Sequence, residues 1–198
     1  MKLTSKNKKS TEKMVLGAMM TALVILFQYI ATYTTFFGPF STAMGLIPII
    51  IGASMCGIGT GAWLGIVFGA VVLFTGGANL FLAFNIPGTI LTVLLKGAAC
   101  GAAAGAVNKL LSKFNKYVAA LGAAIVCPVT NTAVFLLGCV IFFMPHADAI
   151  AAQIGMDVTG MQLFLALAMA NFALELGMNI ILCPIVVRIL NIKRKSKI

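Results

Sequence analysis

The residue of this chain with the clearest chemical potential is a lysine inside an apolar run. Lys96 lies in residues 89–111, a stretch that is otherwise long and apolar enough to cross a bilayer. A charged group at that depth costs at least about 2.5 kcal/mol, so it normally faces a protein interior or a wet cavity. Its chemistry there would be the binding of an anion, most simply a carboxylate. Thr92 lies one helical turn earlier on the same face.

Polar side chains in two other apolar segments could complete such a site. Asn171, Glu175 and Asn179 are spaced by four residues in the last segment, and Asn131 follows a Cys-Pro pair in the preceding one. These groups can accept and donate hydrogen bonds to hydroxyls or amides of a ligand. The ligand-site candidates are therefore Lys96, Asn131, Asn171 and Glu175, supported by Thr92, Asn85 and Asn179.

A buried ion pair between Lys96 and Glu175 that only fixes helix packing is the structural alternative. At 1.5 Å per residue, Lys96 lies roughly 10 Å below the outer end of its helix and Glu175 roughly 20 Å below the outer end of its own. Water or a polar ligand between the two side chains fits this offset better than direct contact.

Other kinds of chemistry have little support in the sequence. His146 and Asp148 form an H-x-D pair in a predicted loop without the further ligands that a metal needs. There is no nucleotide-binding Walker motif, and no apolar segment carries a histidine that could act as a base for a nucleophile. We therefore expect neither an enzyme nor a bound metal or cofactor.

The composition indicates the elements that must position these residues. The chain has 198 residues, of which 61% are hydrophobic and only 9% charged, as in an integral membrane protein. This length holds six spans with short connections. We predict an all-α, six-transmembrane-helix bundle over residues 14–190, between a mobile basic tail at 1–13 and a basic tail at 191–198. The predicted spans are 14–33, 42–56, 60–75, 89–111, 117–144 and 161–190.

The net charge of +10 comes largely from three basic clusters, one before the first span, one in residues 109–116 and one at the carboxyl end. Such clusters stay in the cytoplasm, so both termini are expected there. Nucleic-acid binding is not indicated, because no aromatic residues for base stacking are interleaved with the basic ones.

Two ridges of small residues predict close helix packing. They consist of Gly61, Gly65 and Gly69, and of Gly97, Gly101 and Gly105. Pro48 is expected to free the carbonyl group of Met44 and bend the second span, whereas Pro87 fits a helix start. Residues 34–41 and 76–88 are the expected outside loops next to these helices.

The size, six apolar segments and basic inside ends resemble the S components of energy-coupling factor (ECF) vitamin transporters. The resemblance also includes the pair Ala18 and Ala22 in an A-x-x-x-A arrangement, and the run LIPIIIGASMCGIGTGAWLGIVFG at residues 46–69. It covers about residues 14–190.

This resemblance implies a subunit of the bacterial plasma membrane that captures a water-soluble vitamin from outside, with loops 34–41 and 76–88 closing over it. Ala18 and Ala22 would dock on a transmembrane coupling subunit (T component), which is bound to two ATPases. Residues 88–97 and 129–132 look most like pantothenate-type members, and Lys96 suits the carboxylate of pantothenate. Biotin and folate satisfy the same argument.

Two other functions remain open on the sequence. A self-sufficient secondary transporter would use Glu175 as a proton relay and accumulate substrate without an ATPase. A purely structural membrane subunit would bind no small molecule.

Overall fold

The computed structural model describes residues 2–33, 44–158 and 160–195, and this part of the chain is helical and contains no strand. The predicted all-α class is thus confirmed for these residues. The elements are α1 (Lys2–Tyr33), α2 (Leu46–Cys56), α3 (Ile58–Phe74), α4 (Asn79–Leu82), α5 (Ile86–Leu111), α6 (Lys116–Gly138), the π-helix η1 (Cys139–Phe143), the short helix η2 (Met144–His146), α7 (Ala147–Ile154) and α8 (Gly160–Lys195).

Within the described ranges, four helical segments are long and apolar enough to cross a membrane, as in an integral membrane protein. They are Ser10–Thr32, Ile86–Leu111, Lys116–Ile154 and Gly160–Ile181. The helices α2 and α3 are also apolar but have only 11 and 17 residues. At 1.5 Å per residue, α2 is about 16 Å long, roughly half the hydrocarbon thickness. The expected count of six crossings therefore stays a prediction.

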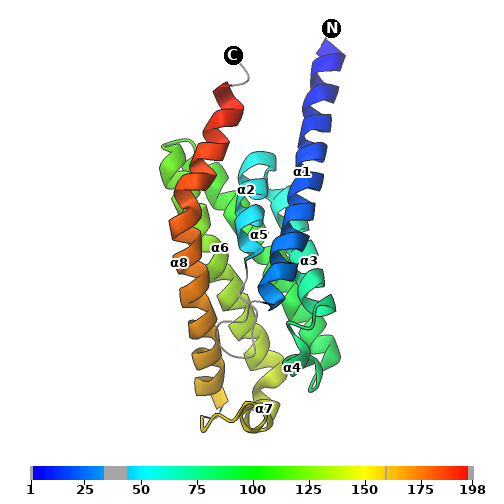
Figure 1. Ribbon diagram of the computed structural model, residues 1–198, viewed down its shortest axis with the longest axis vertical. Helices are drawn as coiled ribbons and strands as arrows, with labels where there is room; N and C mark the ends of the chain where they lie inside the picture. Colours follow the sequence, from blue (N-terminus) through cyan, green and yellow to red (C-terminus); the bar gives the residue numbers. More distant parts are fainter. Residues whose placement is uncertain (1, 34–43, 159, 196–198) are drawn as a thin grey trace.

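The basic segments at the two ends of the chain continue helices. Helix α1 begins at Lys2, where we expected a mobile tail, and α8 extends to Lys195, beyond the predicted end of the last span. Figure 1 shows the first residues of α1, the α5–α6 turn and the end of α8 at one end of the molecule, with α4 and α7 at the other. This arrangement matches the common side predicted for the three basic clusters, and the cytoplasmic location of that side stays a prediction.

The two glycine ridges pack against each other, one from α3 and one from α5. A Cβ atom added to Gly65 would collide with the carbonyl oxygen of Gly97, and one added to Gly61 would collide with that of Gly101. Backbones approach this closely only where side chains are absent. The prediction of tight packing on these ridges is confirmed, and the contact fixes the helix that carries Lys96.

The structure contradicts the predicted role of Pro48 and confirms that of Pro87. Pro48 lies in the first turn of α2, because that helix begins at Leu46. The prediction that Pro48 frees the Met44 carbonyl was wrong, since that carbonyl accepts a hydrogen bond from the Ile47 amide at 3.4 Å. The first turn tolerates proline because its N–H groups have no partner within the helix. Pro87 occupies the first turn of α5, as predicted.

Short helices replace the loops expected at the end of the molecule that holds α4 and α7. Residues 76–88 contain α4, and residues 145–160, the predicted loop that holds His146 and Asp148, contain α7. The predicted loop at 34–41 lies outside the described residues. Phe81 of α4 packs into an apolar cluster with Phe143, Ile150 and Phe164. This cluster closes the bundle beside the polar residues of α6 and α8.

Candidate functional site

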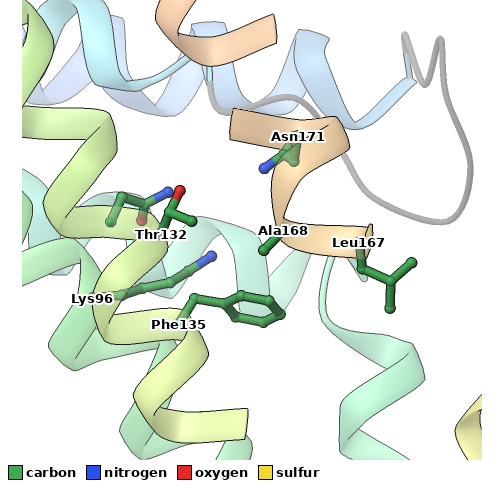
Figure 2. Close-up of a pocket in the computed structure, with 7 residues that line it drawn as sticks. Lys96, Thr132, Phe135, Leu167, Ala168 and Asn171 are labelled. Atoms are coloured by element: carbon green, nitrogen blue, oxygen red, sulfur yellow. The ribbon is translucent and has the colours of Figure 1, made fainter. Parts of the chain in front are cut away.

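Three helices, α5, α6 and α8, surround a cavity of about 40 Å³. Figure 2 shows Lys96 reaching toward α8 beside Thr132 and Phe135 of α6. The side chains that line the cavity are Lys96, Asn131, Thr132, Phe135, Leu167, Ala168 and Asn171. The volume holds about three water molecules, well below the roughly 300 Å³ or more of a typical ligand pocket. A vitamin would therefore need these helices or the adjoining loops to move apart.

Lys96 lies at this cavity with its charge unpaired by direct contact. Its Nζ atom is 5.4 Å from the centre of the Phe135 ring, within the range of a cation–π interaction. Within the described part of the chain, Lys96 makes no hydrogen bond and no salt bridge with a carboxylate. The direct ion pair that was the structural alternative is thus not formed, and the ammonium group is available to an anion that enters the cavity.

Glu175 is buried behind the cavity and is held by two asparagines from different helices. Its Oε2 atom accepts a hydrogen bond from Asn131 Nδ2 at 3.2 Å, and its Oε1 atom accepts one from Asn171 Nδ2 at 2.6 Å. The carboxylate also attracts the Lys96 ammonium group electrostatically. All four main candidates predicted from the sequence therefore belong to one polar cluster, with the two asparagines lining the cavity and connecting to Glu175.

An aromatic contact joins the cavity to the connection between α3 and α5. The Phe81 ring of α4 packs edge-on against Phe135, with 5.5 Å between ring centres, and against Phe143, at 4.9 Å. Phe135 in turn lies under the Lys96 ammonium group. A movement of α4 would therefore shift the Phe135 ring that lines the cavity.

Asn85, predicted to support the ligand, is the N-cap of α5. Its side chain accepts a hydrogen bond from the Gly88 amide at 3.0 Å, and its Nδ2 atom donates to the carbonyl oxygen of Phe142 at 3.5 Å. It does not line the cavity described above. Its visible role is to start the helix that carries Lys96 and to attach it to η1.

Thr92 and Asn179, the other supporting candidates, are buried but do not line the cavity either. The Thr92 side chain fills the space beside Gly138 of α6, where a Cβ atom would collide with it. Thr92 Oγ1 and Asn179 Nδ2 have no hydrogen-bond partner among the described residues. A ligand role for either residue stays a prediction.

Four lining residues were absent from the predicted site, namely Thr132, Phe135, Leu167 and Ala168. Helical spacing was the signal that could have found three of them. Phe135 lies four residues after Asn131, and Leu167 and Ala168 lie four and three residues before Asn171. Thr132 directly follows Asn131, a spacing that does not share a helix face, so only its polar side chain pointed to it.

The predicted docking residues Ala18 and Ala22 lie in a part of α1 that is open to the surroundings, and both side chains are exposed. Large apolar neighbours in the same helix, including Met14 and Met19, are exposed as well. Such a surface faces lipid or another membrane helix.

The described residues include no group of three or more His, Cys, Asp or Glu side chains that could hold a metal ion. The polar cluster instead offers a cation and several hydrogen-bonding groups inside an apolar bundle. In a membrane protein, this combination can bind a small polar molecule.

Comparison with known proteins agrees with this class. A family model for the substrate-specific component of ECF transporters matches residues 12–187. Since the match covers most of the chain, the protein belongs to that family, whose members bind a vitamin-type substrate and work with a T component and ATPases. No curated protein matches the chain, and no solved structure does.

Proposed function

We propose that this protein captures a carboxylated, water-soluble vitamin at the Lys96 cavity for an ECF importer of the bacterial plasma membrane. The observation that carries the proposal is the Lys96 ammonium group, which makes no hydrogen bond or salt bridge within the described residues, beside a cavity lined by two asparagines. An ammonium group in an apolar bundle is stabilised when an anion occupies the space next to it.

Pantothenate is the favoured substrate. It combines one carboxylate for Lys96 with hydroxyl and amide groups for Asn131 and Asn171. The resemblance of residues 88–97 and 129–132 to pantothenate-type members supports the same choice. Biotin and folate carry the same kinds of groups and are the next candidates.

Binding requires the cavity to grow, and the ring contacts of Phe81 support a movement of α4 as part of this change. We propose that the segment 76–88, with α4, closes over the substrate together with residues 34–41. Phe81 contacts Phe135, and the Phe135 ring lies beneath the Lys96 ammonium group. The closing movement of α4 would therefore reach that ammonium group through these two rings.

For delivery, we propose that six segments cross the membrane, namely α1, α2, α3, α5, α6 and α8, with both termini in the cytoplasm. Ala18 and Ala22 would form the contact with the T component, which carries two ATPases. Their exposure on α1 supports this docking face.

A thermal-shift screen of the purified protein against water-soluble vitamins tests the proposal. We expect pantothenate or another carboxylated vitamin to raise the melting temperature, and thiamin and pyridoxine, which lack a carboxylate, to leave it unchanged. No shift with any vitamin would contradict the proposal. Uptake by vesicles that contain only this protein and a proton gradient would instead indicate a secondary transporter.

A further inference from the structure

The hydrogen bonds around Glu175 determine which polar atoms the asparagines have left for a ligand. Asn131 and Asn171 each donate a hydrogen bond from Nδ2 to this one carboxylate. An ionised carboxylate can only accept hydrogen bonds, so the amide nitrogens must face it and the amide oxygens must point elsewhere. The orientation of both amides therefore follows from the chemistry of Glu175.

The Asn131 oxygen shows the consequence most clearly. Asn131 is 2% exposed and lines the cavity, and its Oδ1 atom has no hydrogen-bond partner among the described residues. Buried polar atoms are nearly always satisfied, so an acceptor without a partner beside a cavity indicates a missing donor. Asn171 also lines the cavity, and its amide oxygen is likewise left over by the hydrogen bond to Glu175.

We infer that Glu175 is a positioning residue that orients the side-chain amides of Asn131 and Asn171. With both amide nitrogens directed at Glu175, the site offers amide oxygens beside the Lys96 ammonium group. The substrate must therefore be a carboxylate that also carries O–H or N–H donors. This inference rests on the proposed function. It narrows the substrate class, because a carboxylate without donors would leave the Asn131 oxygen unsatisfied.

Two matched ligand pairs test the substrate class on the wild-type protein by isothermal titration calorimetry. Pantothenate is compared with its dideoxy, N-methylated analogue, in which hydrogen replaces both hydroxyl groups and a methyl group replaces the amide hydrogen, so that no O–H or N–H donor remains. Biotin is compared with lipoate, which also has a pentanoate chain on a sulfur heterocycle but no N–H donor. We expect the donor-bearing member of the pair that binds to have an affinity at least about tenfold higher than its partner.

Glu175→Gln tests the positioning role, because a glutamine presents one donor and one acceptor and lets one asparagine amide turn around. The ratio of affinities within a pair should then fall to about threefold or less. If Glu175 had only a structural role, the substitution would change the affinity for both ligands of a pair by the same factor. Asp157→Asn, which removes an exposed acid elsewhere, should keep the wild-type ratio.

Asn131→Ala provides a second variant that leaves Glu175 in place. It should weaken the donor-bearing ligand about tenfold and change its partner little. Equal binding of both members of a pair by the wild-type protein would overturn the inference while leaving the proposed function intact. Failure of all four carboxylates and of folate to bind would contradict both.

Discussion

Lys96 is the residue whose surroundings differ most from what a charged side chain normally has. Its ammonium group lies within a membrane helix, near an aromatic face and a small cavity, and the nearest acidic group is held by asparagines instead. A charge kept in this way destabilises the fold, because placing a charged side chain at membrane depth costs several kcal/mol of free energy. Retaining it makes physical sense when an anionic ligand supplies the missing partner.

Asn85 offers a clean test of structural against ligand-binding roles. Asn85→Ala should lower the free energy of unfolding by about 1 kcal/mol, the usual effect of losing an N-cap. Vitamin affinity should change less than about threefold, since Asn85 does not line the cavity.

Thermal unfolding in detergent and calorimetry measure the two effects of this substitution. Asn115→Ala is the matched control, because Asn115 caps α6 through the Tyr117 amide in the same way. A large loss of vitamin binding in Asn85→Ala alone would show that Asn85 acts as a ligand-binding residue after all.

The sequence was sufficient to find the polar cluster but not all of its neighbours. Lys96, Asn131, Asn171 and Glu175 could be predicted together because polar groups inside a membrane bundle have few other places to go. Phe135 was missed because phenylalanine is common in this chain, so its residue type does not mark a site and only its spacing of four residues from Asn131 points to the cavity. The cap role of Asn85 depends on where α5 begins, which an apolar pattern fixes only loosely.

At the level of helices, the contact between α3 and α5 holds the site in place. Gly65→Ala should destabilise the protein by about 2 kcal/mol or more, because the added methyl group would meet the Gly97 backbone, which cannot yield as a side chain can. The melting temperature in detergent measures this effect.

Gly59→Ala is the control for that substitution. Gly59 lies in the same helix, and an added Cβ atom there meets nothing within 4 Å. Replacing an open helical glycine should leave stability unchanged or raise it slightly. A melting temperature that falls equally in both variants would mean that the close backbone contact is not important.

Long apolar runs predicted the long helices well, because a membrane leaves the backbone few alternatives to helical hydrogen bonding. The short elements were harder. Whether residues 79–82 and 147–154 are helical depends on tertiary packing of Phe81, Ile150 and their neighbours. The basic residues 2–13 looked like a tail from their charge, yet they continue α1, and composition alone does not determine where a helix frays.

For the whole molecule, the central prediction is its orientation. A cysteine introduced at Lys113, in the α5–α6 turn, should react with a membrane-impermeant maleimide only in inside-out vesicles. One introduced at Asp148 in α7 should react in intact cells, because Figure 1 places α7 at the opposite end. The unchanged protein gives the background from its own cysteines. The reverse pattern of labelling would show that the termini are outside.

Docking to the coupling subunit is a second property of the assembled molecule. Replacing Ala18 and Ala22 together by leucine should reduce copurification of the T component at least about tenfold, because bulky side chains prevent close helix contact. Vitamin binding by the isolated protein should remain. Ala173→Leu, at an exposed position of α8, is the matched control, and undiminished copurification of the double variant would place the docking face elsewhere.

The most direct test of the account is the affinity of Lys96→Met for the carboxylated vitamin that the wild-type protein binds best, measured by isothermal titration calorimetry. Methionine keeps most of the length of the side chain and removes its charge, and Lys113→Met in the α5–α6 turn serves as the control. We predict that affinity falls at least about 30-fold in Lys96→Met, equivalent to about 2 kcal/mol, and is unchanged in the control. Binding by Lys96→Met within about threefold of the wild-type value would contradict the claim that this ammonium group recognises the substrate.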